Sequence, residues 1–177
     1  MNKIFNNDSV VVVDNFFEDF HRLEEGFRDV SLWDIDNHPT QSKDKELYWP
    51  GYRSVDLKES MPFMTSLYIE TVKKKVGIDS PFKLGIYTHL RTEETEKEDY
   101  VHQDNCWVSG LVYLSRTNLD SGTQFYDSEN GNITQTVKFV QNRAVFFKAS
   151  MWHRVLNGHG TDIGDGRYTL NTFFGYL

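Results

Sequence analysis

The sequence has little cysteine and little proline: Cys106 is the only cysteine, and 4 of the 177 residues are prolines. A lone cysteine forms no disulfide within the chain, which excludes a disulfide-stapled scaffold and is typical of a reducing compartment. A long apolar run is also missing near the N-terminus. The stretch Val10–Val13 is shorter than the roughly 7–15 apolar residues of a signal peptide or the roughly 20 of a membrane helix. These absences predict a cytoplasmic protein without a membrane segment.

Basic residues are outnumbered as well. The chain carries 19 Lys and Arg against 26 Asp and Glu, a formal net charge of −7. Because affinity for phosphate backbones comes mainly from Lys and Arg, this balance disfavours a nucleic acid as partner. A peptide or a small molecule is the expected substrate, and a local basic pocket is compatible with the overall charge. Nothing in the pattern indicates an oligomeric state.

Aromatic residues, by contrast, are abundant. They make up 15% of the chain (13 Phe, 9 Tyr and 4 Trp), although the apolar fraction is only 38%. Large rings pack well in strands, so much of the buried area is expected to lie in β-structure. The length suits one domain of ordinary size, and we expect a single domain over residues 1–177.

The first 80 residues are expected to form a helical support and a lid segment. Val10–Val13 is a short strand candidate, and the spacing of apolar residues predicts a helix over Phe17–Val30. A second helix is predicted over Pro62–Val76, because proline suits a first helical turn and Gly77 suits a C-terminal cap. Residues 31–54 are polar and without a clear period, which is typical of a lid or a binding loop.

Residues 81–177 are rich in short β-branched and aromatic segments separated by turn signals. Such closely spaced strands without intervening helices are typical of an antiparallel sandwich or jelly roll, with the two helices covering one sheet from outside. The predicted strands are Phe82–Leu90, Tyr100–Asp104, Trp107–Ser115, Thr123–Asp127, Thr134–Val140, Arg143–Ala149, Met151–Leu156 and Arg167–Tyr176.

His102 and Asp104 are the first candidate metal ligands. On a strand, residues two apart share a face, so an imidazole and a carboxylate point the same way and can bind one metal ion. The triplet alone is weak, because chance predicts roughly 0.5 such patterns in a chain of this composition. A surface histidine near an aspartate is the favoured explanation of the triplet until further residues support a metal site.

His153 and Arg167 supply those further residues. His153 lies 51 residues after His102 in an apolar segment, where a buried core histidine is the competing interpretation. A glycine-rich connection then leads to Arg167, and a hairpin of the two strands would put Arg167 on the order of 10 Å from His153. That gap suits a small dicarboxylate that chelates the metal at one end and pairs with the guanidinium at the other. Thr169 shares the strand face of Arg167, although a surface ion pair remains the alternative role for this arginine.

The set His102-x-Asp104, His153 and Arg167-x-Thr169 on short strands resembles the iron(II)- and 2-oxoglutarate-dependent oxygenases, in particular the prolyl-4-hydroxylase-like branch. The resemblance covers roughly residues 82–177 and implies a double-stranded β-helix (a jelly roll of the cupin kind). The pattern departs from many relatives at Ser121-Gly122, where they have two glycines, and at Arg167, where many of the branch have lysine.

By this resemblance, His102, Asp104 and His153 are catalytic residues that bind Fe(II), and Arg167, Thr169 and Tyr87 bind the cosubstrate 2-oxoglutarate. Dioxygen is the other cosubstrate, and the reaction releases succinate and CO2. Asp104 favours hydroxylation over halogenation, because the halogenating relatives lack the carboxylate ligand. For Tyr87, a half-buried strand tyrosine is an equally good interpretation.

Several neighbouring residues are open to two interpretations. His89 shares a strand face with Tyr87, but surface exposure is the favoured expectation. The acidic segment 91–99 is interpreted as a solvated loop, with a gate that favours cationic substrates as the alternative. The aromatic segment 48–53 is expected to be a loop anchored by packing, with a substrate lid as the alternative.

The favoured function is a dioxygenase that hydroxylates a peptide residue, such as proline, or a small metabolite. Two alternatives stay open: a non-catalytic jelly-roll protein that binds a metal or ligand, and a cupin-type metalloenzyme that does not use 2-oxoglutarate. Arg167-x-Thr169 argues against both. Substrate choice lies in variable loops on a common fold, and no pattern in residues 31–54 or 91–99 identifies it.

Overall fold

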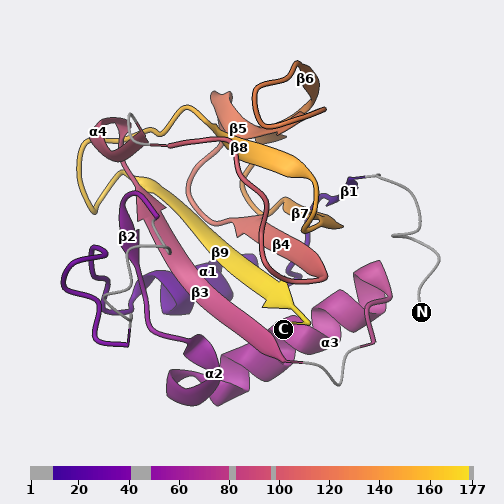
Figure 1. The fold of residues 1–177 in the computed structure, drawn as a ribbon. Coiled ribbons are helices and arrows are strands. Elements are labelled where there is room, and N and C mark those ends of the chain that lie inside the picture. Colours follow the sequence, from indigo (N-terminus) through magenta and orange to yellow (C-terminus); the bar gives the residue numbers. More distant parts are fainter. Residues whose placement is uncertain (1–9, 41–48, 80–82, 97–98, 176–177) are drawn as a thin grey trace.

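Two antiparallel sheets face each other, and helices cover the outer side of the larger one (Figure 1). The computed structural model describes residues 10–40, 49–79, 83–96 and 99–175. The elements in chain order are β1 (Val11–Val13), α1 (Phe20–Arg28), β2 (Tyr52–Arg53), α2 (Leu57–Ser60), α3 (Pro62–Val76), β3 (Leu84–Arg91), α4 (Glu93–Glu96), β4 (Val108–Tyr113), β5 (Asn118–Tyr126), β6 (Ile133–Phe139), β7 (Ala144–Lys148), β8 (Trp152–Leu156) and β9 (Arg167–Phe174).

The larger sheet has the strand order β1-β7-β4-β9-β3-β2, and the smaller sheet has the order β6-β5-β8. Strands that are neighbours in space are therefore mostly distant in the sequence. Strand β9 lies between β3 and β4 and pairs with both over most of its length. This central position explains why the final segment, which is largely buried, reads as a nearly continuous run of large residues.

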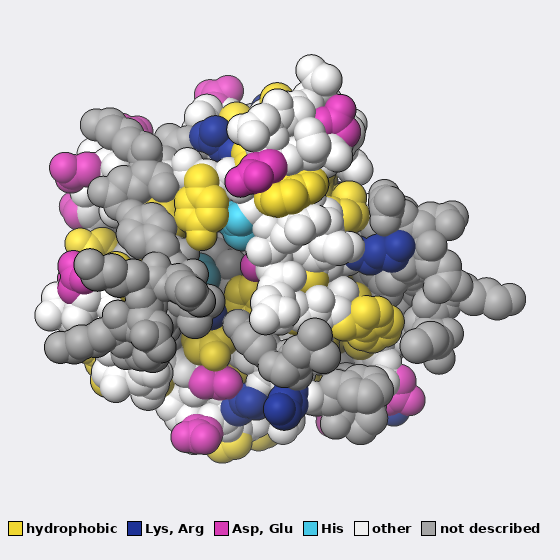
Figure 2. Space-filling view, viewed as in Figure 1, with side chains coloured by type: hydrophobic (Ala, Val, Ile, Leu, Met, Phe, Trp, Pro, Cys, Tyr) yellow, Lys and Arg dark blue, Asp and Glu magenta, His cyan; other side chains and the backbone are white. Residues whose placement is uncertain are grey.

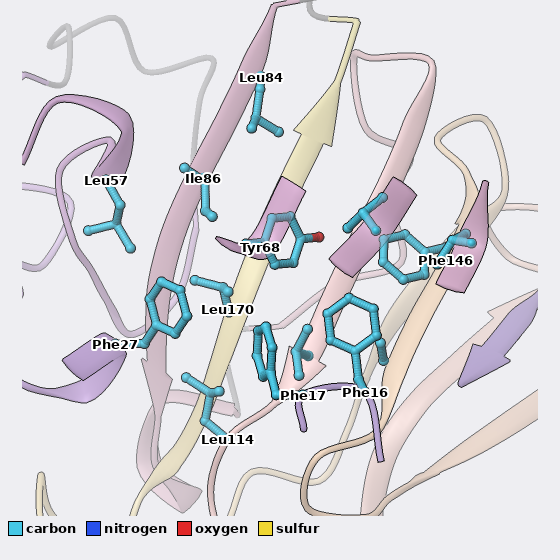
Figure 3. Packing of buried hydrophobic residues seen from close by; sticks show 14 of the residues in the cluster. Phe16, Phe17, Phe27, Leu57, Tyr68, Leu84, Ile86, Leu114, Phe146 and Leu170 are labelled. Atoms are coloured by element: carbon cyan, nitrogen blue, oxygen red, sulfur yellow. The ribbon is translucent and has the colours of Figure 1, made fainter. Parts of the chain in front are cut away.

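Side chains alternate between the two faces of the larger sheet. On β3, Ile86 and Leu90 are fully buried in a core that also contains residues of the helices, whereas Tyr87 and His89 project from the opposite face. The core under the helices includes Phe16 and Phe17, in the segment just before α1, and Tyr68 of α3. Figure 3 shows these rings packed against the sheet. The expected arrangement of helices outside one sheet is confirmed.

Helix α3 begins and ends where the sequence indicates. Pro62 occupies its first turn, and Gly77 ends it in the left-handed conformation with φ of 73°. The backbone N–H of Gly77 donates to the carbonyl groups of Val72 and Lys73, which extends the hydrogen bonding of the last helical turn to the cap residue. The first helix is shorter than predicted: α1 spans Phe20–Arg28, whereas the sequence predicted Phe17–Val30.

A second apolar cluster lies between the two sheets. It contains Tyr113, Phe125, Phe139 and Phe147, all of them almost completely buried. The rings of Tyr113 and Phe139 stack with centroids 4.2 Å apart. The aromatic excess of the sequence therefore fills both the core under the helices and the space between the sheets.

The predicted hairpin of the last two strands is wrong. Strand β8 pairs with β5 in the smaller sheet, whereas β9 belongs to the larger sheet. The connection between them crosses from one sheet to the other. Its four glycines make such a crossing possible, but they do not indicate which strand β9 pairs with. Register arguments from sequence assume that successive strands pair, and a jelly roll breaks that assumption.

Smaller differences concern residues 91–104. The predicted strand Tyr100–Asp104 is reduced to one isolated bridge between His102 and His153. The predicted acidic loop contains the short helix α4. The start of the predicted strand at Phe82 and parts of the two variable segments (residues 41–48 and 97–98) lie outside the described residues. In the part of the chain that is described, no helix combines the length and the apolar character that crossing a membrane would require.

Candidate metal centre

The two candidate histidines are joined through their backbones. The N–H of His102 donates to the carbonyl of His153 at 3.0 Å, and the N–H of His153 donates to the carbonyl of His102 at 2.9 Å. This reciprocal pair adds the segment around His102 to the free edge of β8. As a result the two rings lie side by side, with centroids 4.4 Å apart.

Asp104 completes the group. Its backbone N–H donates to the carbonyl of Ala149 at 2.9 Å, which holds the residue beside the start of β8. One carboxylate oxygen lies 4.0 Å from Nε2 of His102 and the other lies 3.4 Å from Nε2 of His153. All three potential ligand atoms lie within 4.8 Å of one another. The structure thus brings together the three residues that the sequence singled out as ligands.

Hydrogen bonds to carbonyl groups fix the tautomers of both histidines. Nδ1 of His102 lies 3.0 Å from the carbonyl oxygen of Tyr100, and Nδ1 of His153 lies 2.9 Å from that of Met151. Because a carbonyl oxygen only accepts, each Nδ1 carries the proton and donates it. Each Nε2 is then left with a lone pair directed towards the carboxylate, which is the arrangement a bound metal ion requires.

The carboxylate of Asp104 is held in the same way. The hydroxyl of Ser109 on β4 donates to its Oδ2 at 2.5 Å. Ser109 was not identified from the sequence, because a serine inside an aromatic strand carries no sign of what its hydroxyl contacts. The strand period did contain one signal: Ser109 lies two residues before Leu111 and therefore shares its face of the sheet, which is the inner one.

His153 is the most buried of the three side chains, with 9% of its surface exposed against 28% for His102 and 17% for Asp104. Burial lowers the pKa of His153, although the charge of Asp104 opposes this shift. The imidazole is therefore neutral near pH 7, as a metal ligand must be. Figure 2 shows histidine side chains in a recess of this face, beside hydrophobic groups.

A cavity of about 660 Å³ extends from these residues between the sheets. Arg167, Thr169 and Tyr87 all line it, so the structure places every candidate site residue around one space. Arg167 is 3% exposed and donates from NH2 to the carbonyl of Gly122 at 3.2 Å. Its guanidinium lies over the rings of Tyr113 and Phe139, at 5.6 Å and 5.1 Å from their centroids. Arg167 reaches the cavity from the larger sheet and not through the hairpin that the sequence predicted.

Tyr113 is a second residue that sequence reasoning missed. Its hydroxyl lies 2.9 Å from Oγ1 of Thr123, and burial raises the pKa of the phenol while Arg167 opposes the shift. The Tyr113 ring lies beneath the Arg167 guanidinium, and Thr123 lines the cavity. The sequence pattern identified the segment around Tyr113 as a strand. It did not show that Arg167 of another strand lies beside this tyrosine.

The expectation that His89 is exposed is wrong. Its side chain is buried, lines the cavity, and faces Thr169 across the β3–β9 pair. The aromatic segment contributes as well: Trp49 is buried, and Arg53 stacks over Tyr87 with 3.9 Å between the guanidinium carbon and the ring centroid. Residues 49–53 are thus a packed wall of the cavity.

The acidic segment is not solvated throughout. Asp99 forms an ion pair with Arg91 at 2.7 Å, and the two side chains are 0% and 9% exposed. The other carboxylate oxygen of Asp99 accepts the backbone N–H of Val155 at 2.8 Å. This residue therefore anchors the end of the segment to β8 just before the ligand pair. Glu93 and Glu94 are exposed on α4, in agreement with the expectation for that part.

Compared by sequence, the chain matches no protein-family model and no curated protein. Compared by structure, it is similar to iron- and 2-oxoglutarate-dependent enzymes. HygX from Streptomyces hygroscopicus, solved with nickel and 2-oxoglutarate bound, gives a TM-score of 0.66 at 14% identity over 98% of this chain and 85% of that chain. A prolyl hydroxylase from Trichoplax adhaerens, in complex with a hypoxia-inducible-factor peptide fragment, gives 0.65 at 10% identity over 96% and 84%.

The epimerase SnoN from nogalamycin biosynthesis, described as non-heme and α-ketoglutarate-dependent, gives a TM-score of 0.60 at 14% identity over 96% of this chain and 79% of that chain. These likenesses show the fold, which is the double-stranded β-helix that the sequence predicted. The three neighbours differ in what they act on, which matches the general separation of fold and substrate.

Proposed function

We propose that this protein is an iron(II)- and 2-oxoglutarate-dependent dioxygenase. The observation that carries the proposal is the set of two histidines and one aspartate with their ligand atoms within 4.8 Å of one another, in a cavity that a buried arginine also lines. The fold shared with enzymes of this kind supports it. A cavity between facing sheets of a small β-barrel or jelly roll is a usual place for such a site.

The donor set suits Fe(II). Two neutral imidazoles and one carboxylate on one face of an ion are the ligands of non-heme iron oxygenases, and they leave positions open for other ligands. His102, Asp104 and His153 would hold the ion, and when bound it supplies the redox chemistry by which dioxygen oxidises 2-oxoglutarate and the substrate. The carbonyl groups of Tyr100 and Met151 keep both imidazoles in the tautomer that binds metal. Ser109 keeps the carboxylate oriented.

Arg167 is the proposed partner of the distal carboxylate of 2-oxoglutarate. A guanidinium is planar and binds a carboxylate through two parallel hydrogen bonds, which are strong where water is excluded. Gly122 and the aromatic rings beneath it hold the guanidinium in place. Thr169 offers a hydroxyl on the same face, and Thr123, which is bonded to the buried phenol of Tyr113, offers another in the cavity wall. Tyr87 is proposed as a weaker contact, because Arg53 already covers its ring.

The proposed reaction is hydroxylation of a peptide residue, such as proline, or of a small metabolite, with release of succinate and CO2. Peptide and small-molecule ligands both occur among the structural neighbours, in the prolyl hydroxylase and in HygX with hygromycin B. The chain's own contribution is to hold the reactants and to keep water away from the reacting centre. Leu111 and Phe147 give the inner part of the cavity an apolar wall for that purpose.

The proposal is tested by optical spectroscopy under anaerobic conditions. Fe(II) and 2-oxoglutarate added to the protein are expected to produce the visible charge-transfer band of the chelate. His153→Ala should abolish the band because it removes a ligand. Arg167→Ala should retain the band but require at least about tenfold more 2-oxoglutarate, since it removes a charge-assisted contact.

Folding of each variant is checked by circular dichroism, and Arg22→Gln, on the exposed surface of α1, serves as a control that removes a positive charge far from the cavity. Folded wild-type protein that gives no band would contradict the proposal. Succinate formation, measured alone and with pools of peptides and metabolites, then identifies substrates that raise turnover above the uncoupled rate.

A further inference from the structure

His89 has a buried nitrogen that faces the cavity without a hydrogen-bond partner. The side chain is 8% exposed, and Nε2 has no partner among the described residues. The other ring nitrogen, Nδ1, lies 3.4 Å from the amide nitrogen of Asn171 on β9. Because an amide NH2 group only donates, Nδ1 accepts and the ring proton belongs to Nε2. His89 therefore presents an N–H donor to the cavity.

The ring stays neutral near pH 7. Burial, followed by the charges of Arg53, Arg91 and Arg167, lowers its pKa well below the usual value for histidine. A neutral donor surrounded by cations is unsuited to a cationic ligand. It is well suited to an acceptor group with negative charge, which would also satisfy a nitrogen whose burial without a partner is otherwise unfavourable.

Arg53 is fixed beside His89. The two residues are directly opposite in the β2–β3 pair, so their side chains project from the same face. The guanidinium is enclosed by three aromatic rings, with centroids at 3.9 Å for Tyr87, 4.9 Å for Trp49 and 5.5 Å for Phe173. Stacking of this kind orients the plane of a guanidinium, and a guanidinium in a fixed plane matches the geometry of planar oxyanions.

Trp49 adds a further donor at the same place. Its side chain is 8% exposed, and its indole Nε1–H has no hydrogen-bond partner in the described part of the chain. Trp49, Arg53 and His89 all line the cavity. Among the described acids that line the cavity, Asp99 pairs with Arg91, Asp56 pairs with Lys58, and Asp104 belongs to the candidate metal centre.

We propose that Trp49, Arg53 and His89 form a second anion-binding site, which holds a carboxylate or phosphate group of the substrate. This inference rests on the proposed function, in which the metal and Arg167 engage both carboxylates of 2-oxoglutarate and leave this site for the substrate. The rings of Tyr87 and Phe173 beside it fit an apolar or aromatic body attached to the anion. The proposed site therefore favours an anionic substrate, which is the opposite of the cationic substrate that a gate formed by the acidic segment 91–99 would favour.

Binding of three small probes tests the site by isothermal titration calorimetry. Benzoate and phenyl phosphate carry the two candidate anions on an aromatic ring, and benzamide is the neutral control of the same shape. Each is titrated into wild-type protein, once alone and once with Ni(II) and saturating 2-oxoglutarate. At least one anion is expected to bind at least about tenfold more tightly than benzamide under both conditions, and the preferred anion shows which group the substrate carries.

Three variants locate the binding. Arg53→Gln should weaken the preferred anion at least about tenfold while leaving benzamide and 2-oxoglutarate affinity unchanged. His89→Leu should weaken it severalfold, and His89→Gln should restore most of the loss because glutamine keeps an N–H donor. Arg22→Gln, remote on α1, should change nothing.

Three results would overturn the inference: neither anion binds better than benzamide, the Arg53 and His89 variants bind the anion as wild type does, or 2-oxoglutarate displaces the anion. The last result would mean that the probe occupies the Arg167 end of the cavity. Because the titration without metal needs no iron chelate, these outcomes are separate from failure of the charge-transfer test. A normal band with no anion binding rejects only the second site.

Discussion

At the scale of single residues, the candidate centre is held together by groups that are not ligands. Carbonyl oxygens of Tyr100 and Met151 fix the two imidazoles, and the hydroxyl of Ser109 fixes the carboxylate. Each contact fixes the orientation of a ligand side chain before the metal ion binds, so less conformational entropy is lost on binding. Such supporting groups typically contribute a factor of about 10–100 to metal affinity.

Ser109→Ala is therefore expected to lower the affinity for Fe(II) by about tenfold or more, because the Asp104 carboxylate loses the donor that orients it. Competition with a chelator of known affinity measures the change. Ser115→Ala is the matched control, since it removes a buried serine hydroxyl that bonds to Gly166 and Tyr168 and not to a ligand. Equal metal affinity in both variants would show that Ser109 has no orienting role.

The buried ion pair of Arg91 and Asp99 gives a prediction about stability. Asp99→Asn should lower the free energy of unfolding by about 3–5 kcal/mol, because it leaves the Arg91 charge buried without its partner. Urea denaturation of variant and wild type measures the difference. The double variant Arg91→Met/Asp99→Leu should recover most of the loss, and a double variant as unstable as the single one would contradict this explanation.

The same pair has a pH dependence of known sign. Burial alone would raise the pKa of Asp99, but the charge and hydrogen bond of Arg91 outweigh it and leave the pKa below its usual value. A carboxyl group with a depressed pKa stabilises the fold above its unfolded pKa of about 3.9, and that contribution disappears as the pH falls through the folded value. Loss of the Arg91–Asp99 pair is thus expected only in strong acid.

At the scale of elements, the sequence predicted those whose ends carry local signals. The α3 helix was located correctly because Pro62 and Gly77 act through their own backbone preferences. Most of the predicted strands overlap observed ones for the same reason, since β-branched and aromatic runs lie between turns, whereas Tyr100–Asp104 forms only an isolated bridge. Pairing partners carry no local signal, which is why the β8–β9 hairpin was predicted wrongly. The role of His89 was missed for the same reason, because its neighbours Arg53 and Thr169 are far away in the sequence.

Gly77 offers a test at this scale. Gly77→Ala should destabilise the protein by about 1 kcal/mol, because a side chain in the left-handed conformation at φ of 73° is strained. Gly77→Asn should be less unfavourable, since asparagine tolerates this conformation better. Thermal denaturation compares the three proteins, and an alanine variant more stable than the asparagine variant would argue against the cap explanation.

At the scale of the whole molecule, the candidate site draws on both sheets and both halves of the chain. The candidate metal ligands were identifiable from sequence because their types and order are unusual together, whereas the cavity wall depends on packing. The predicted roles of His102, Asp104, His153, Arg167, Thr169 and Tyr87 remain predictions for the experiments above. Their shared cavity is the part that the structure adds.

Global stability should respond to mild acid through His159. Burial, assisted by the charge of Arg167, lowers its pKa to about 4, whereas the unfolded value is about 6.5. The unfolded chain then binds a proton that the folded chain does not, so the free energy of unfolding falls as the pH drops from about 6.5 towards 4. Because the ring is partly exposed, we expect about 1 kcal/mol.

The measurement is urea denaturation of wild type and His159→Gln at pH 7.5 and pH 5, with the difference between the two pH responses attributed to this ring. His21→Gln, exposed on α1, is the control and should keep the wild-type response. An unchanged pH response in the His159 variant would contradict the assignment.

The order of the larger sheet has a practical consequence for dividing the chain. The exposed turn near residues 128–131 separates β1–β5 from β6–β9, and from β1 to β3 every neighbouring pair in that sheet joins a strand of one part to a strand of the other. Of the described strand pairs, only the two-residue pair of β2 and β3 stays within one fragment. Together they interdigitate, and only their union places His102 and Asp104 beside His153 and Arg167. We therefore expect that the protein cut at this turn behaves as a complementation pair, whose reassembly would be measured as recovery of the proposed metal binding.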